Sequence, residues 1–306
     1  MSLLAVGTVA LDHIETPFAS QRNVLGGSAT FLALAARFFT DDVRLVAAVG
    51  DDFPDAYTAM LRDAGVRLNG LEVQPGGKTF SWTGRYHYDF NSRDTLDTQL
   101  NVLETFQPVV PEAFRDARIV CLGNLEPSIQ ADVLGQMSAP AYTILDTMNF
   151  WIEQTPDALA QTLRLVDCLI VNDAEARQLA DDPSLIRAAS KIRTMGPKTL
   201  IIKKGEHGAL LFSDDTVFAA PAFPLEDLHD PTGAGDAFMG GFAGYLARCR
   251  AVTPHTLRRA VVCGSVVASF SVEAFGPARL LSLTQAELNA RTRAYEQLAF
   301  IPAEED

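Results

Sequence analysis

The chain has 306 residues, of which 48% are hydrophobic, enough for one large α/β domain or two small domains with a buried core. Its formal net charge is −13 at pH 7. Such an acidic surface repels phosphate backbones, so we expect no nucleic-acid partner, and any nucleotide site must supply its own local positive charge.

Short apolar runs alternate with helical patterns along the chain. Runs that are apolar on both faces predict strands at 3–9, 43–49, 119–122, 142–145, 168–171, 200–202 and 209–212. Helical patterns fall between most of these runs, at 30–38, 54–64, 129–137, 157–165 and 174–180, and further helices follow at 234–250, 254–271 and 285–300. This order is typical of an α/β protein whose parallel sheet is covered on both faces. Without repeats or flexible linkers, we expect a single domain over residues 1–306.

One segment, 79–90, breaks this order because apolar and polar residues alternate in it. The positions of its apolar face are Phe80, Trp82, Gly84, Tyr86, Tyr88 and Phe90. A period of two predicts a strand with one exposed and one covered face, which does not suit a buried parallel sheet. We therefore expect a small β-flap that projects from the main domain. An ordinary edge hairpin is the alternative.

The cysteines and the apolar segments point to an intracellular setting. Cys121 and Cys168 lie in apolar runs and no C-x-x-C pair occurs, so we expect buried, reduced thiols. The apolar run 261–270 is too short to span a membrane. Residues 1–7 lack the basic region and the cleavage site of a secretory signal. We expect a cytoplasmic protein with no membrane partner.

The residues Gly-Gly-Lys-Thr at 76–79 look like the end of a phosphate-binding P-loop. That pattern needs a glycine at position 72, where Glu72 stands, and a helix after the threonine. The alternating segment follows instead of a helix. We therefore interpret 76–79 as a turn.

The most specific motif is Asp-Pro-Thr-Gly-Ala-Gly-Asp-Ala-Phe at 230–238, at the start of an expected helix. Its Gly-Ala-Gly run opens the helix, although Gly is a poorer helix former than Ala by about 1 kcal/mol. Without bulky side chains, the free amides of a helix N-terminus can hold a phosphate group. Asp236 follows in the first turn, where a carboxylate can accept the proton of an attacking hydroxyl. The alternative is a Thr232 N-cap and an Asp that complements the helix dipole.

This string, with its continuation Gly-Gly-Phe at 240–242, resembles the C-terminal signature of the ribokinase-like (PfkB) family of sugar and nucleoside kinases. The resemblance extends over essentially the whole chain. It implies a three-layer α/β/α sandwich with a mainly parallel central sheet and a small β-lid formed by about 12–25 and 76–105. It also implies ATP-dependent phosphoryl transfer to a hydroxyl, with Asp236 as the catalytic base and an anion hole formed by Gly233, Ala234 and Gly235.

On the acceptor side, the resemblance implies that Asp12 binds substrate hydroxyls and that Gly26 and Gly27 let a helix end approach the substrate. Many sugar kinases of the family follow the glycine pair with an Asn that bonds sugar hydroxyls, and Phe31 stands there instead. Its ring either turns into the core or forms an apolar wall. The segment that begins at Asp146 is similar to a substrate-side segment of some sugar kinases, but its spacing differs and we assign it no role.

The acceptor therefore stays open. A small sugar is the first hypothesis and a nucleoside is the second. A non-catalytic nucleotide-binding regulator is the alternative from another class, although a pure binder does not need Asp236.

The resemblance also implies a site for ATP. Lys203, Gly205, Gly208 and Thr232 would lie beside the nucleotide. Lys203 stands where many relatives carry Thr, and its charge would offset that of the phosphates. A solvated lysine at a strand end is the alternative.

Metal sites are implied at two places. Asn172 and Glu175 match an N-x-x-E element that is associated with Mg²⁺ and phosphate, through metal-bound water. Their spacing alone predicts a capping box, and both roles can coexist. Asp230 and the loop 272–276 match a monovalent-cation site such as one for K⁺. This loop differs from that of better-known members, so the cation requirement stays open.

The lid implied by the resemblance falls on the alternating segment. A lone small flap cannot bury an apolar face on itself, so the face needs substrate, the main domain or a second flap. We expect a lid that closes over the acceptor. Lids of relatives often pair across a two-fold axis, so a homodimer formed through the lid is a further hypothesis.

Overall fold

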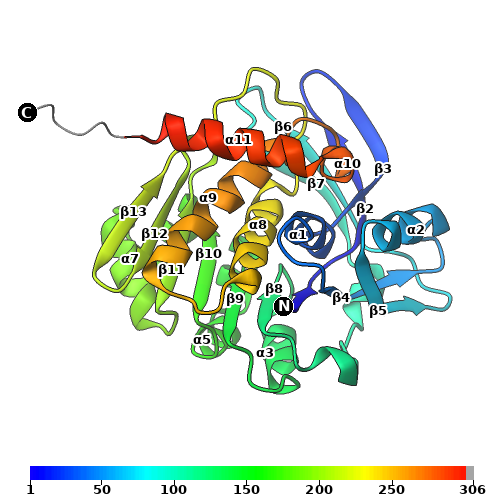
Figure 1. Cartoon of the computed structure of the whole chain (residues 1–306). Coiled ribbons are helices and arrows are strands. Elements are labelled where there is room, and N and C mark those ends of the chain that lie inside the picture. The colour runs from blue at the N-terminus through cyan, green and yellow to red at the C-terminus, as the bar shows by residue number, and fades with distance from the viewer. Residues whose placement is uncertain (301–306) are drawn as a thin grey trace, which may run out of the picture.

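The computed structural model describes residues 1–300, and its centre is a nine-stranded sheet in the order β13-β12-β11-β10-β9-β8-β1-β4-β5 (Figure 1). Neighbouring strands are parallel, except that β12 is antiparallel to both of its neighbours. The strands are β1 Leu3–Val6, β4 Val43–Gly50, β5 Val66–Gln74, β8 Ile119–Leu122, β9 Tyr142–Asp146, β10 Cys168–Asn172, β11 Thr199–Lys203, β12 Ala209–Ser213 and β13 Thr216–Ala220. The predicted mainly parallel sheet is confirmed.

Helices cover both faces of this sheet, and strand residues alternate between them. On β1, Leu3 and Ala5 face a buried cluster with α1, α8 and α9, whereas Leu4 and Val6 face another with α3, α5 and α7. This arrangement is the expected three-layer sandwich. The helices are α1 Ser28–Ala36, α2 Asp55–Asp63, α3 Pro127–Gly135, α4 Asn149–Gln154, α5 Pro156–Leu163, α6 Asp173–Ala180, α7 Leu185–Thr194, α8 Ala234–Arg248, α9 Pro254–Ser271, α10 Ala278–Ser282 and α11 Gln285–Leu298, with short 3₁₀ turns at Asn101–Glu104, Glu112–Phe114 and Gly205–His207.

Several elements have no counterpart in the sequence prediction. β5 and β13 are the edge strands, and most of their residues are at least partly exposed, so they lack the apolar pattern of the inner strands. The helices α4 and α10 are short, and α7 buries only three residues. The first strand is also shorter than expected, because β1 ends at Val6.

A second sheet of four strands, the lid sheet, has the order β3-β2-β6-β7. Its strands are β2 Ala10–Glu15, β3 Ser20–Gly26, β6 Ser81–Tyr86 and β7 Arg93–Gln99. Figure 1 shows it beside the main sheet rather than in it, which confirms that the alternating segment belongs to a flap. A Cβ at Gly84 would lie 1.9 Å from the indole ring of Trp82, so the glycine leaves room for this ring to lie along the strand.

The expected strand 79–90 is too long at its far end, because β6 stops at Tyr86. The chain turns there, and the carboxylate of Asp89 accepts hydrogen bonds from the amides of Asn91 and Ser92. Tyr88 and Phe90 lie in this turn and not on the strand. The segment 76–79 is a turn, as expected, with the Gly77 amide donating to the Gln74 carbonyl.

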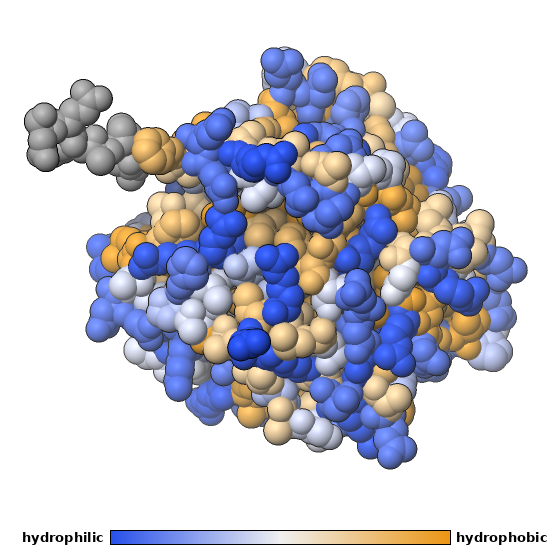
Figure 2. Space-filling view, viewed as in Figure 1, coloured by the Kyte–Doolittle hydropathy of each residue, from blue (hydrophilic) through white to orange (hydrophobic). Residues whose placement is uncertain are grey.

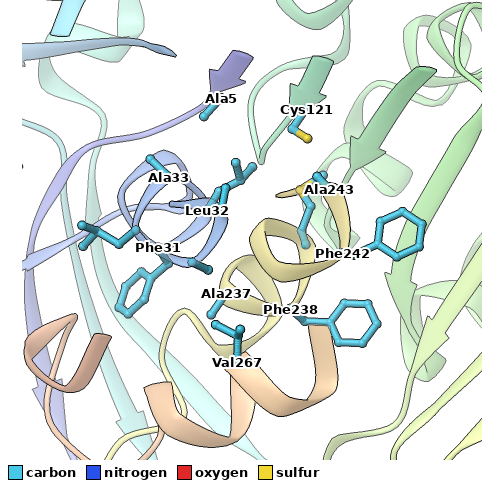
Figure 3. Close-up of a cluster of buried hydrophobic side chains, with 14 of the residues drawn as sticks. Ala5, Phe31, Leu32, Ala33, Cys121, Ala237, Phe238, Phe242, Ala243 and Val267 are labelled. Carbon is cyan, nitrogen blue, oxygen red and sulfur yellow. The ribbon is translucent and has the colours of Figure 1, made fainter. Parts of the chain in front are cut away.

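Helix α8 is in close contact with the helices on either side because it lacks side chains where they meet. A Cβ at Gly240 would lie 2.3 Å from the carbonyl oxygen of Leu32 on α1, and one at Gly244 would lie 2.8 Å from that of Ala36. Gly241 faces α9 in the same way, with 3.0 Å to the nearest backbone oxygen. Figure 3 shows the buried side chains of α1 and α8 that pack beside this contact. The position of α8 is therefore set by backbone-to-backbone packing.

Hydrophilic side chains predominate on the face shown in Figure 2, with hydrophobic ones scattered among them. The four cysteines are free, and Cys121, Cys168 and Cys263 are buried, as expected for reduced thiols. Within residues 1–300, no helix combines the length and the hydropathy needed to cross a bilayer.

Replacing Gly240 by Ala should separate α8 from α1, because the added methyl group has no room against Leu32. We expect the free energy of unfolding to fall by about 1–3 kcal/mol, as for other overpacked cores. Gly135→Ala is the matched control, because nothing lies within 4 Å of its added Cβ. The control should be neutral or up to about 1 kcal/mol more stable. Urea unfolding measures both, and equal values for the two variants would contradict the packing described here.

Candidate active site

Polar side chains gather where three neighbouring strands of the main sheet end. Asp146 ends β9, Asn172 ends β10 and Lys203 ends β11, and Asn172 lies directly opposite Lys203 in the strand register. Carboxyl ends of parallel strands meet at one edge of a sheet, which is where α/β proteins bind ligands. Helix α8 begins beside this edge, because the Lys203 ammonium lies 2.7 Å from the position that a Cβ at Gly235 would occupy.

The N-terminus of α8 has the geometry of an anion site. Gly233 is the N-cap residue with φ 74°, and no side chain within the described residues caps the helix. The first amides of an uncapped helix point outward without intrahelical partners. The interpretation of Thr232 as a side-chain cap is therefore wrong: its hydroxyl donates instead to the hydroxyl oxygen of Tyr86, 3.1 Å away.

Lys203 is surrounded by carboxylates. Its Nζ lies 3.8 Å from Asp146 Oδ1, and only 19% of its side chain is exposed, so it is not a solvated lysine. Burial lowers the pKa of Lys203, but the negative charges of Asp146, Glu175 and Asp236 outweigh this effect and raise it. The lysine therefore stays charged, so this edge of the sheet carries a local positive charge within an acidic chain.

Burial of Asp236 raises the pKa of its carboxyl to about 7, and the negative charge of Asp146 adds to this effect. The positive charges of Lys203 and Arg93 oppose it. A carboxyl with a pKa near the working pH is well suited to accept a proton in a reaction.

Asp12 lies on β2 of the lid sheet. The residue is 4% exposed, and its Oδ1 has no hydrogen-bond partner in the described part of the chain. Burial raises the pKa of Asp12 to about 7, amide hydrogen bonds from Trp82 and Gly27 lower it, and the charge of Asp236 raises it. The charge of Asp230 also raises the pKa of Asp12, and its effect is larger than that of Asp236.

The glycine pair makes room for this carboxylate. A Cβ at Gly26 would lie 2.0 Å from Asp12 Oδ2. Gly27 has φ 92° at the N-cap of α1, and a Cβ there would lie 2.4 Å from the Thr8 carbonyl oxygen. Phe31 is 1% exposed, and its ring packs against Gly233. Its ring therefore lies in the core beneath the anion site.

Asn172 and Glu175 form the capping box that their spacing predicts. Asn172 Oδ1 accepts from the Glu175 amide at 2.8 Å, and Glu175 Oε2 accepts from the Asn172 amide at 2.8 Å. Burial raises the pKa of Glu175 to about 7, and the charge of Asp146 adds to the effect. Residues 1–300 contain no cluster of three potential ligands that could hold a metal without further partners. Mg²⁺ does not require such a cluster, since it binds one or two carboxylates together with phosphates and water.

Asp230 connects two loops directly. Its carboxylate accepts from the amide of Thr232 at 2.9 Å and from the amide of Gly276 at 3.0 Å, and the residue is fully buried. The amides of His229 and Asp230 donate in turn to the Val272 carbonyl. The structure thus places Asp230 against the loop 272–276, as the sequence implies, with protein amides making the connection.

The loop around Gly205 and Gly208 lies at the end of β11. Both glycines have positive φ, 54° and 82°, and a Cβ at Gly208 would lie 2.0 Å from the Ala220 carbonyl oxygen. The lid sheet reaches this loop, because Asn91 Nδ2 donates to Glu206 Oε1 at 3.1 Å. The glycines therefore shape a tight turn beside Lys203.

Three residues of the site, Asp146, Tyr86 and Arg93, were not predicted from the sequence. The signal for Asp146 was present, since it ends an apolar strand just as Asn172 and Lys203 do. Tyr86 and Arg93 come to the site from the lid sheet, and no local pattern places that sheet relative to α8.

Replacing Asp12 by Asn should stabilise the protein at alkaline pH. Between the ordinary aspartate pKa of 3.8 and a pH of about 7, the folded protein holds a proton on Asp12 that the unfolded chain has lost. The free energy of unfolding therefore falls as the pH rises over this range, and the loss is complete above about pH 7. Asp12→Asn should therefore be more stable than the wild type by about 1–4 kcal/mol at pH 8, at about 1.4 kcal/mol per pKa unit. The difference should shrink toward pH 4. Urea unfolding at several pH values measures it, with the exposed Asp215→Asn as control. A difference that is the same at pH 5 and 8 would rule out a penalty from the buried charge.

Comparison with known proteins identifies the family. The model of the pfkB family carbohydrate kinases matches residues 4–283. A cytidine kinase from Thermococcus kodakarensis is 29% identical over 251 residues, which cover 80% of this chain and 88% of that protein. A nucleoside kinase from Methanothermobacter thermautotrophicus is 28% identical over 298 residues, which cover 89% of each.

Among solved structures, the aminoimidazole riboside kinase of Salmonella enterica, complexed with aminoimidazole riboside and an ATP analog, has the same fold. Its TM-score is 0.77 at 21% identity, with 95% of this chain and 100% of that chain covered. The chain therefore belongs to the pfkB family of carbohydrate kinases and is a phosphotransferase with an alcohol group as acceptor.

Proposed function

We propose that the chain transfers the γ-phosphoryl group of ATP to a ribose hydroxyl of a nucleoside, with Asp236 as the general base. The observation that carries this proposal is the position of Asp236 in the first turn of α8. The uncapped amides of the helix and Lys203 lie beside it, and its charge raises the pKa of Asp12 on the lid sheet. A phosphate and a hydroxyl can therefore both approach one carboxylate.

One feature of the site favours a nucleoside over the free sugar that was the first hypothesis. It is not Phe31, because this ring is buried in the core and does not distinguish the two acceptors. Trp82 shares a face of β6 with Gly84 and Tyr86, and Tyr86 contacts the main domain, so the indole ring lies on the side of the lid sheet that faces the site. An aromatic ring there can stack on a base. In addition, the relatives matched over most of the chain are named cytidine kinase and nucleoside kinase.

Each residue has a distinct task in the proposed reaction. Asp12 accepts hydrogen bonds from the acceptor and orients it. Asp236 takes the proton of the attacking hydroxyl, for which a pKa of about 7 is favourable. The amides of 233–235 hold the negative charge that spreads over the transferred group. Lys203 offsets the charge of the phosphates.

The pfkB family implies a divalent metal with the nucleotide, and the residues present fit Mg²⁺. Glu175 and Asp146 are the residues that would hold it, through water, since Asp146 Oδ1 has no hydrogen-bond partner among the described residues. When bound, the metal neutralises phosphate oxygens. We assign no step to a monovalent cation at Asp230.

The test is release of ADP over a panel of nucleosides and free sugars, with ATP and Mg²⁺. We expect release with at least one nucleoside and a much lower rate with ribose or fructose. A sugar that is used as well as every nucleoside would favour the sugar kinase. ATP binding without release for any acceptor would favour a non-catalytic regulator.

Asp236→Asn should remove phosphoryl transfer and leave ATP binding nearly intact, because an amide cannot accept the proton. The loss should be about 10²–10⁴-fold in kcat. In the wild type, kcat/KM should decline as the pH falls below about 7, because the carboxylate then takes up a proton. Steady-state kinetics from pH 5 to 9 measure both, with Asp215→Asn as the control. A variant that keeps half of the wild-type kcat would exclude Asp236 as the base.

Trp82→Ser should raise the KM for the acceptor about tenfold and increase ATP hydrolysis without transfer, because the lid then covers the site poorly. Tyr88→Ser is the matched control, since this ring lies in the turn of the lid sheet and is 81% exposed. It should leave the acceptor KM unchanged. Unchanged kinetics in both variants would show that the strand is not a lid.

Pairing of two lids stays a prediction. The exposed aromatic rings of Phe18 and Tyr88 support it, with ring centroids 5.9 Å apart. If lids pair, Tyr88→Ser should shift the mass measured by light scattering from dimer toward monomer.

A further inference from the structure

A groove lies between the lid sheet and the C-terminal helices. It is lined by residues 21–24 of β3, by Tyr57 of α2, and by His229, the loop 273–275 and Ala278 at the start of α10. Its volume of about 490 Å³ is within the range of small-molecule sites, which is about 300–1,000 Å³. The elements β3, α2 and α10 come together on the right of Figure 1. Among the described residues, none with a task in the proposed reaction lines this β3 groove, so it is a second candidate binding site.

The charges in the β3 groove favour an anion. Glu273 is the only acidic residue among the described residues that line it, and arginines bond both of its carboxylate oxygens. Arg279 Nε donates to Oε2 at 2.9 Å, and Arg291 Nη2 donates to Oε1 at 2.5 Å. Arg22 also lines the groove, is exposed, and belongs to no ion pair within residues 1–300. Its planar guanidinium is therefore available to a phosphate group, which it can bond through two oxygens.

The other side chains of the groove suit a flat ring with polar edges. Phe275 and Tyr57 offer partly exposed aromatic rings, on which a base can stack. Gln21 and Asn23 lie on the same wall as Arg22, and within the described residues their side-chain amides take part in no hydrogen bond. Such an amide can donate and accept at once, as the edge of a base requires. A ring, a polar edge and a phosphate together describe a nucleotide.

The backbone of β3 is distorted where it lines the groove. The register between β2 and β3 shifts between Asp12 and Ile14, and Asn23 has a positive φ of 55°. The Asn23 amide donates to His13 Nδ1 at 3.0 Å, and its carbonyl oxygen accepts from the Tyr57 hydroxyl at 2.9 Å. Bulges and left-handed backbone conformations are frequent beside binding and active sites. The distortion therefore lies at the groove and is held by Tyr57, which lines the groove itself.

Both walls of the groove continue into the candidate active site. On β3, Val24 lies directly opposite Asp12 in the strand register, and a Cβ at Gly26 would lie 2.0 Å from the Asp12 carboxylate. On the other wall, the Gly276 amide donates to the carboxylate of Asp230 at 3.0 Å. A Cβ at Gly276 would lie 2.3 Å from the side chain of Val24, so the two walls touch each other here. A molecule that moves either wall will therefore disturb the position of Asp12.

We propose that the β3 groove binds a nucleoside monophosphate and that this binding weakens the binding of the acceptor. The inference rests on the proposed function, because a nucleoside kinase makes a product of this class. Arg22 bonds the phosphate, and the aromatic rings and side-chain amides hold the base. The ligand displaces β3, and Asp12 has no spare room against Gly26, so its carboxylate no longer points correctly at the acceptor. The product thereby slows its own formation, through coupling between two sites.

Calorimetric titration measures the binding directly. AMP, GMP, CMP and UMP are titrated separately into the protein, whose ATP site is kept filled with a non-hydrolysable ATP analogue and Mg²⁺. At least one of them should bind the wild type, and Arg22→Gln should weaken this binding about 10–100-fold, as the loss of a hydrogen bond to a charged group does. No binding of any monophosphate to the wild type would overturn the proposal.

Two further variants locate the ligand. Arg62→Gln, which removes an exposed arginine of α2 outside the groove, is the matched control and should bind as the wild type does. Asp12→Asn separates the groove from the acceptor site, since a monophosphate can also enter the latter as product, and it should retain most of the wild-type affinity. Binding that is lost in Asp12→Asn and retained in Arg22→Gln would place the ligand in the acceptor site and contradict the proposal.

Steady-state kinetics measure the coupling. In the wild type, the monophosphate should raise the KM for the acceptor about fivefold or more and then level off, because both molecules can bind at once. This rise should be lost in Arg22→Gln and kept in Arg62→Gln. A ligand that competes for the acceptor site raises this KM without limit, and such a result would count against the groove.

The two proposals fail in different ways. A wild type that transfers phosphate to no acceptor would refute the kinase function, and with it the coupling to acceptor binding, while the titration would still decide whether the groove binds the ligand. A wild type that phosphorylates nucleosides, but whose acceptor KM is unaffected by every monophosphate, would refute the coupling and leave the kinase function standing.

Discussion

The site depends on holding several buried carboxyls around one lysine. Burial disfavours the charged form of a carboxyl, and the pKa values of Asp12, Glu175 and Asp236 all rise to about 7 for this reason. The lysine and the amides of α8 partly offset the cost. Above neutral pH these carboxyls are charged although they are buried, which lowers the free energy of unfolding. Natural proteins often accept such a loss of stability where a reaction requires it. The overall charge of −13 makes the local concentration of positive charge more important.

The scaffold holds this cluster by close packing of backbones. Glycines at 240, 241 and 244 let α8 lie against α1 and α9, and Gly233 rests on the ring of Phe31. The helix N-terminus therefore cannot shift without disturbing the core beneath it. A preorganised anion site of this kind needs little rearrangement when the phosphate arrives. The β6–β7 hairpin of the lid sheet is held differently, because it contacts the loops of the site through side-chain hydrogen bonds and not through packed backbones.

Much of the fold follows from local patterns. The inner strands are apolar on both faces and separated by helices, which is sufficient to predict the parallel sheet and its two helical layers. The edge strands β5 and β13 could not be predicted in this way, because many of their residues are exposed and lack the continuous apolar pattern of the inner strands. The string 230–238 likewise predicts the anion site, since glycines weaken a helix start unless its amides must approach a ligand closely. Asp146 could have been found in this way, because it ends an apolar strand as Asn172 and Lys203 do. Tyr86 and Arg93 could not, because they belong to the lid sheet, and no local pattern predicts how segments far apart in the sequence pack together.

The two contacts of the β6–β7 hairpin also bear on how molecules would leave the proposed site. The hairpin reaches both the loop at 230–232 and the loop at 205–207, so it bridges the two sides of the candidate site. Under the proposed function, the hairpin would have to lift before nucleotide and phosphorylated product leave by that side. Each contact is a single hydrogen bond between side chains, with a net value of about 0.5–1.5 kcal/mol. Breaking both contacts would therefore cost little, and under the proposed function the bound molecules themselves would supply most of the stability of a closed hairpin.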